Sequence, residues 1–170
     1  TVDSDTNFGW LDYSTRLYYP KKNVHKDLRV LSNSVEVSII KRKIIDLIDQ
    51  LNDGVSKNTS IAIITPYRAQ KEALAKMVNS LRSSISVGDI RIEVDTVDAF
   101  QGKEADVVFF SFVRNNGSAQ FYGDARRLNV ALSRAKTHLY LVGSREYLGA
   151  QKYASLKSLV KLTVLSHHKA

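Results

Sequence analysis

The sequence predicts an α/β domain in which a central, mostly parallel sheet carries helices on both faces. Two short, wholly apolar runs, residues 61–64 and 107–110, are rich in β-branched or aromatic side chains, which favours strands buried on both faces. Segments with helical spacing of apolar residues lie between such runs, and short polar loops join them. This alternation is typical of a parallel sheet covered on both sides.

The N-terminal part of the chain predicts one strand and one long helix. We expect a short strand over residues 8–13, within a stretch from 1 to 30 that is otherwise poorly defined, and an exposed basic loop over 18–22. From 33 to 52 the apolar side chains follow one face of a helix. Gly54 predicts the end of this helix, because glycine adopts the left-handed conformation common at helix ends.

A second helix is expected directly after the first apolar run. Thr65 is predicted as its N-cap and Pro66 as its first residue, where the missing N–H costs nothing. A strand over 92–97 and a tight turn over 98–102 follow, and the next strand is expected over 106–112.

Two arginines stand on the last predicted helix. Asp124 is expected to cap a helix over 125–136, and a strand over 139–142 follows it. At about 100° per residue, Arg127 and Arg134 lie within about 20° of each other beside the face that packs on the sheet. Planar and permanently charged guanidinium groups suit a developing phosphoryl charge. The alternative is an ordinary basic helix with a solvated stripe.

Composition and charge restrict the classes of function. The chain has 170 residues, enough for a single domain over 1–170, and its 25 basic against 17 acidic residues give a net charge of +8. This charge favours a polyanionic partner. The absence of cysteine excludes disulfides, a thiol nucleophile and a Cys-based zinc site, and it fits the cytoplasm, or the nucleus of a eukaryote. No apolar run is long enough to cross a bilayer, so we expect no membrane partner.

Polar clusters directly follow the predicted strands. Because ligands bind at the carboxyl ends of parallel strands, we expect residues 65–67, 96–104 and 114–115 to meet at one edge of the sheet. At the first cluster, the free N–H groups of a helix start favour an anion, and Tyr67 offers a flat face for a base. The alternative is a well-capped helix with a surface tyrosine.

The second cluster has the groups that phosphate and sugar require. Gly102 permits a close backbone approach, and Gln101 can bond to phosphate oxygens or water. Lys103 offers a charge, and Glu104 can accept hydrogen bonds from sugar hydroxyls. The alternative is a polar loop between two strands.

Taken in order, the three clusters resemble motifs IV, V and VI of superfamily 1 helicases. The likeness is closest to the group that contains the nonsense-mediated-decay helicase and the senataxin-like enzymes, and it extends from about residue 31 to residue 148. The stretch Ser32-Asn33-x-x-Glu36 also resembles this family. The blocks that carry the likeness are Ile63-Ile64-Thr65-Pro66-Tyr67-x-x-Gln70, Thr96-Val97-Asp98-Ala99-Phe100-Gln101-Gly102-x-Glu104-x-Asp106 and Arg126-Arg127-Leu128-Asn129-Val130-Ala131-Leu132-Ser133-Arg134-Ala135.

This resemblance implies a second RecA-like motor domain, which is a three-layer α/β unit that supplies half of an ATP site. Tyr67 would stack on the base of the nucleotide, with Gln70 supporting that loop. Gly102 would bring backbone N–H groups to the phosphates, and Glu104 would hold the ribose.

The resemblance also implies catalytic and strand-binding residues. Arg134 would be the arginine finger, with Arg127 near it in the same motif and Gln101 as a third catalytic residue. A single strand would be held mainly through its backbone. The residues implied near that strand are Thr65, Thr96 and Arg114.

The chain departs from a complete motor in one respect. It contains no Gly-x-x-x-x-Gly-Lys-Ser/Thr sequence and no strand ending in the Asp-Glu pair that organises magnesium. In such enzymes both belong to the first motor domain. We therefore expect ATP with Mg²⁺ to bind at a seam with an N-terminal RecA-like domain of the same, monomeric protein, and we expect no metal ligands in this chain.

The expected function is that of the C-terminal motor domain of an ATP-dependent helicase or translocase acting on DNA or RNA, inactive on its own. The alternative is a non-catalytic nucleic-acid-binding or protein-interaction module on the same fold, which the net charge and the missing phosphate loop favour. A dehydrogenase requires a Gly-x-Gly-x-x-Gly turn that is absent. A hydrolytic triad would need a nucleophile context that none of the histidines has.

Overall fold

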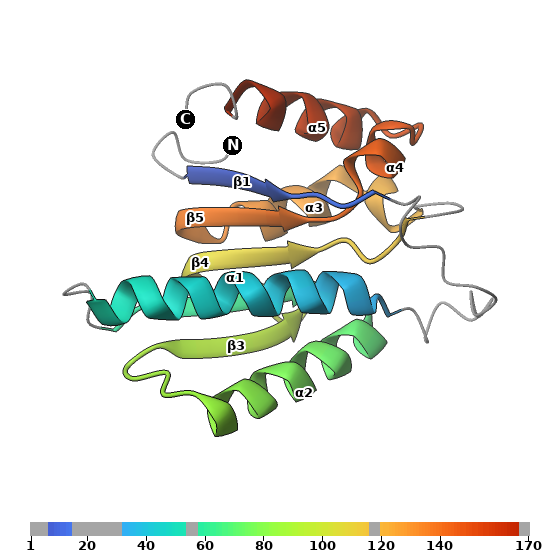
Figure 1. The fold of residues 1–170 in the computed structure, drawn as a ribbon. Coiled ribbons are helices and arrows are strands. Elements are labelled where there is room, and N and C mark those ends of the chain that lie inside the picture. The colour runs from blue at the N-terminus through green and yellow to red at the C-terminus, as the bar shows by residue number, and fades with distance from the viewer. Residues whose placement is uncertain (1–6, 15–31, 54–57, 116–119, 167–170) are drawn as a thin grey trace.

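The computed structural model describes residues 7–14, 32–53, 58–115 and 120–166, and these residues form a parallel sheet between two layers of helices (Figure 1). The sheet has the strand order β1-β5-β4-β2-β3, and every recorded pairing is parallel. This confirms the predicted fold class. The strands are β1 (Asn7–Leu11), β2 (Ser60–Thr65), β3 (Arg91–Thr96), β4 (Ala105–Ser111) and β5 (Ala135–Val142).

Two hydrophobic clusters pack against the two faces of the sheet. One face carries α1 (Ser34–Asp53) and α2 (Arg68–Ser84), and in Figure 1 α1 lies in front of the sheet and runs along its strands. The other face carries the 3₁₀ turn η2 (Gln120–Gly123), α3 (Ala125–Leu132), α4 (Arg145–Gly149) and α5 (Ala154–Ser166). No helix in the described part of the chain has the length and apolar character that crossing a membrane would require.

Strand β2 lies inside the sheet because its side chains suit burial on both faces. Ile61 and Ile63 pack toward α1 and α2, whereas Ala62 and Ile64 join the cluster beneath α3. All four are at most 1% exposed. Strand β4 lies beside β2 and is equally apolar, which confirms the interpretation of the two runs as buried strands.

The structure corrects the start of α2. Thr65 was expected to cap this helix, but it is the last residue of β2, where it pairs with Thr96 of β3. The extended backbone therefore continues to Tyr67, which precedes the helix and makes no side-chain capping bond. Thr65 instead accepts a 3.5 Å hydrogen bond from the Tyr67 N–H at its Oγ1.

The structure also corrects the end of α3. The helix was expected to continue to residue 136, but it ends at Leu132, and Ala135 already pairs with Ala105 in the sheet. The Arg134 carbonyl accepts a hydrogen bond from the Ala105 N–H at 3.1 Å, so the strand ladder replaces the helical bonds there. Arg127 and Arg134 consequently do not stack on one helix.

The other predicted elements agree with the structure to within a few residues. Strand β1, helix α1, strands β3 and β4, the turn after β3 and the Asp124 cap all form where they were expected. Strand β5 begins at Ala135, earlier than expected. The expected helix end at Gly54 and the basic loop over 18–22 lie outside the described residues.

Candidate nucleotide and nucleic-acid site

The candidate residues lie at both ends of the parallel strands. We call the end where the strands finish the carboxyl edge and the end where they begin the amino edge. Strands β3 and β4 are both parallel to β2, so the loop over 97–104 must return from the carboxyl end of β3 to the amino end of β4. Glu104 therefore precedes β4 at the amino edge, and Arg134 precedes β5 at that same edge. The expectation that every polar cluster lies at the carboxyl edge is wrong for these residues.

At the carboxyl edge, Tyr67 lies beside Arg114. Burial raises the pKa of the Tyr67 hydroxyl, and the Arg114 guanidinium, which is hydrogen-bonded to it, partly opposes this rise. Both side chains are half-buried. Thr65 is fully buried below them, and Thr96 accepts the Ala99 N–H at 3.4 Å. An aromatic ring beside a guanidinium is a surface on which a base can stack, close to a charge for a phosphate.

Gln70 is fully buried and bonded at both ends of its amide. Its Oε1 accepts the Asn33 N–H at 2.8 Å, and its Nε2 donates to the Asn33 carbonyl at 3.2 Å and to Ser111 Oγ at 3.1 Å. The amide joins the first turn of α2 to the start of α1 and the end of β4. Such bonding agrees with a residue that supports a loop rather than one that contacts a ligand.

A buried carboxyl group, Glu36, lies next to this amide. Its Oε1 accepts from Ser111 Oγ and from the Val113 N–H, both at 2.9 Å, and its Oε2 accepts from the Tyr13 hydroxyl at 2.8 Å. Burial raises the pKa of Glu36 to about 7, although these hydrogen bonds act in the opposite direction. The sequence indicated Asn33 and Glu36 only through the family resemblance, without a role.

Val113 has a strained backbone that no sequence signal indicated. Its φ of +69° lies in the left-handed region, which a β-branched residue rarely adopts and which costs about 1–3 kcal/mol. The Arg114 N–H donates to the Phe112 carbonyl at 2.7 Å and closes a three-residue turn about Val113. This turn determines where the chain places Arg114.

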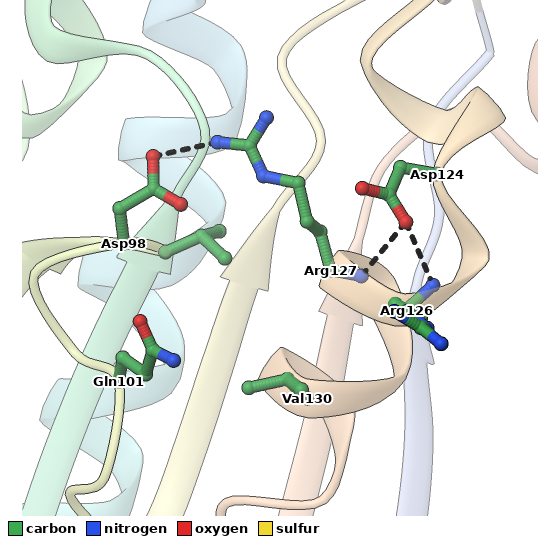
Figure 2. A pocket seen from close by; sticks show the side chains of 7 residues that line it. Asp98, Gln101, Asp124, Arg126, Arg127 and Val130 are labelled. Atoms are coloured by element: carbon green, nitrogen blue, oxygen red, sulfur yellow. Dashed lines mark hydrogen bonds and ion pairs between the residues drawn. The ribbon is translucent and has the colours of Figure 1, made fainter.

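The loop after β3 and the start of α3 enclose a pocket of about 290 Å³ (Figure 2). Arg127 Nη2 and Asp98 Oδ2 approach to 2.6 Å across it, with side chains 41% and 72% exposed. Asp124 Oδ1 accepts the Arg126 and Arg127 N–H groups at 3.0 and 3.4 Å and so orients the start of α3. The pocket is lined by Val97, Asp98, Gln101, Asp124, Arg126, Arg127 and Val130.

The amino-edge group comprises the Gly102 turn, Glu104 and Arg134. Gly102 has a φ of +80°, and a Cβ there would meet no atom within 4 Å. Glu104 is exposed and lies 3.9 Å from Lys136. Arg134 is half-buried, its Nε has no hydrogen-bond partner, and it forms no ion pair with the described residues.

Lys103 is bound to carboxylates of β3 and does not join the amino-edge group. Its Nζ lies 2.7 Å from Glu93 and 3.4 Å from Asp95, and the hydrogen bond to Glu93 raises the pKa of Lys103. The Lys103 charge, which the sequence analysis assigned to phosphate binding, is thus paired with carboxylates of the domain itself. Among the described residues there is also no cluster of three or more His, Asp or Glu side chains that could hold a metal.

The structure therefore brings the predicted residues together in three groups. Register places Val107 level with Ile61, so Glu104 and Tyr67 are offset by nine residues, which is about 30 Å along extended strands. The carboxyl edge has Thr65, Tyr67, Gln70, Thr96 and Arg114; the pocket between has Gln101 and Arg127; the amino edge has Gly102, Glu104 and Arg134.

A parallel sheet between two helical layers, with these polar groups at the ends of its strands, is a three-layer α/β domain of the kind to which RecA-like domains belong. Residues 4–146 match the family described as AAA domain. The chain belongs to this family, as a C-terminal motor domain of the superfamily 1 helicases related to the nonsense-mediated-decay and senataxin-like enzymes.

Three curated relatives illustrate the likeness. The DNA replication ATP-dependent helicase/nuclease dna2 of Schizosaccharomyces pombe is 36% identical over 141 residues, which are 80% of this chain and 9% of the relative. Helicase sen1 of the same organism is 38% identical over 68% of this chain and 7% of its own length. The Regulator of nonsense transcripts 1 homolog of Drosophila melanogaster is 42% identical over 56% of this chain and 8% of its own. The chain thus spans less than a tenth of these relatives.

Proposed function

We propose that this chain is the C-terminal motor domain of an ATP-dependent helicase or translocase that acts on DNA or RNA. The observation that carries the proposal is Arg134, which directly precedes β5 at the amino edge and forms no ion pair with the other described residues. Arginine side chains are ordinarily paired when half-buried, so the unsatisfied Nε of Arg134 supports a partner outside the described residues, such as an anion at the domain seam.

The proposed ATP site uses the amino edge. ATP with Mg²⁺ would supply the phosphoryl group, held at the seam with an N-terminal RecA-like domain of the same protein. Backbone N–H groups of the Gly102 turn approach the phosphates, and Glu104 accepts from the ribose. Arg134 neutralises the charge that develops on the γ-phosphate. Gln101 and Arg127, which line the pocket between the loop after β3 and the start of α3, would orient water and the phosphates once the two domains close.

The carboxyl edge is proposed to hold the single strand. Tyr67 was expected to stack on the base of ATP, but its distance from Glu104 and its contact with Arg114 favour a base of the strand instead. Thr65 and Thr96 line the same edge, and Gln70 supports the Tyr67 loop from below. Closure of the two domains on ATP at one edge would then move a strand held at the other, in a monomeric motor of the cytoplasm or nucleus.

The test is Arg134→Ala in the full-length protein that contains this chain. We expect single-strand-stimulated ATPase to fall by about 10³–10⁵, because the arginine finger acts in the transition state, while nucleotide affinity changes little. Arg42→Ala is the matched control, since Arg42 is exposed on α1, which packs against the opposite face of the sheet. Near-normal ATPase in the Arg134 variant would contradict the assignment.

The second candidate is a non-catalytic binding module, which the net charge of +8 favours. It predicts that the isolated chain binds a single strand while the full-length protein shows no ATPase that depends on Arg134. Turnover by the intact protein eliminates this candidate.

A further inference from the structure

The turn that places Arg114 is held from both sides by one pair of buried side chains. Glu36 Oε1 accepts the Val113 N–H at 2.9 Å, and Asn33 Nδ2 donates to the Val113 carbonyl at 2.9 Å. Glu36 is fully buried and Asn33 is 3% exposed. The backbone N–H and carbonyl of the strained residue Val113 are therefore both hydrogen-bonded within the protein. Strained backbone persists when its surroundings hold it in this way.

The same pair is attached to the loop that carries Tyr67. The Asn33 N–H and carbonyl are bonded to the Gln70 amide, and Ser111 Oγ lies between that amide and Glu36. Asn33 Oδ1 also caps α1, because it accepts the Val35 and Glu36 N–H groups at 3.1 Å. Segments from α1, α2 and β4 thus meet at one hydrogen-bonded network.

We propose that Glu36 is a positioning residue for nucleic acid: it holds the Val113 turn in its strained form and thereby keeps the Arg114 guanidinium against Tyr67 at the carboxyl edge. The inference rests on the proposed function, because it assumes that this edge binds a single strand. Glu36 itself does not reach the strand, since it is fully buried. Its effect passes through one backbone N–H to the residue that follows.

The chemistry of the neighbours explains why a carboxyl group, which is ionised above about pH 7, is needed at this position. Both oxygens of Glu36 face donors, namely the Ser111 and Tyr13 hydroxyls, the Val113 N–H and the Asn33 amide. A glutamine at this position keeps the shape but presents an NH₂ group where an acceptor is required. The substitution therefore weakens the hold on Val113 without creating a cavity.

The first measurement is amide hydrogen exchange in the 170-residue chain. In Glu36→Gln we expect exchange at Val113 and Arg114 to accelerate about tenfold or more, while amides of the central strand β2 keep their protection. Tyr13→Phe is the matched control, because it removes a donor from the other oxygen of Glu36 and leaves both anchors of Val113 in place. Unchanged exchange at Val113 in Glu36→Gln would overturn the proposal.

The second measurement is the affinity for a fluorescent deoxythymidine 12-mer at fixed salt. Glu36→Gln should weaken binding about tenfold, Tyr13→Phe less than about twofold, and Glu36→Gln combined with Arg114→Ala no more than Arg114→Ala alone. Losses that add in the double variant would show that Glu36 acts through general stability and would refute the positioning role.

The two measurements separate this inference from the function on which it rests. If the unsubstituted chain does not bind the 12-mer, the strand-binding part of the proposed function is contradicted, and the exchange data alone decide whether Glu36 holds the turn. If Glu36→Gln unfolds the chain so that β2 also exchanges, Ser111→Ala replaces it, since this variant removes one donor from Glu36 Oε1 and should accelerate exchange at Val113 more weakly. No acceleration there would overturn the proposal.

Discussion

At the scale of single residues, Glu36 combines full burial with a high pKa. Burial raises the pKa to about 7 from an ordinary value of 4.5. Tyr13, which donates to this carboxyl, has its own pKa raised by burial and so stays neutral throughout the physiological range. The native state therefore holds a proton on Glu36 at pH values where the unfolded chain has lost it.

This difference predicts a pH-dependent contribution to stability. Because the folded pKa is the higher one, the contribution is fully present below pH 4.5 and is lost as pH rises toward 7. The free energy of unfolding of the unsubstituted chain, relative to Glu36→Gln, should fall across this window and level off above it. Urea denaturation at pH 5, 6, 7 and 8 measures this, with the exposed Glu146→Gln as control. A difference that is constant with pH would contradict the prediction.

The proposed arginine finger, Arg134, and the strained residue Val113 differ in how far they could be predicted. The order of three motifs indicated Arg134, because the residue type and its neighbours are visible in the sequence. Val113 carried no such signal, since valine ordinarily disfavours positive φ and only its buried partners, distant along the chain, make that conformation stable. Residues held by non-local bonds are those that sequence patterns miss.

At the scale of elements, α3 depends strongly on its first turn. It has eight residues, so the Asp124 cap satisfies two N–H groups of a helix that has few internal bonds. Asp124→Ala should lower the free energy of unfolding by about 1 kcal/mol, whereas Asp124→Asn, which keeps an acceptor, should change it by much less. Urea denaturation compares the two, and equal losses would show that the charge, and not the cap, is responsible.

The sequence predicted whether a segment is a helix or a strand where the burial pattern allows only one of them. It did not predict the residues at which these elements begin and end. The run 61–64 has only apolar side chains, so a strand covered on both faces was the natural interpretation. The errors at Thr65 and at the end of α3 have one cause. Pairing with Thr96 and with Ala105 extends strands into residues whose local sequence favours a helix, and such pairing depends on partners far along the chain.

At the scale of the whole molecule, the net charge of +8 predicts salt-sensitive binding. The logarithm of the affinity of the chain for the deoxythymidine 12-mer should fall linearly with the logarithm of salt concentration, by about 0.7 per phosphate contact. Arg114→Ala should lower this slope by about 0.7. Arg91→Ala removes an exposed charge at the amino end of β3 and should leave the slope unchanged; equal effects would indicate attraction by net charge alone.

The placement of β1 beside β5 has a consequence for synthesis on the ribosome. Asn7 pairs with His138, so β1 is synthesised about 130 residues before β5, its neighbour among the described strands. At ordinary elongation rates this interval lasts roughly 7–26 s. During this interval Trp10, which is buried in the finished protein, has no sheet to cover it. The nascent chain should therefore be at its most chaperone-dependent until residue 142 has left the exit tunnel.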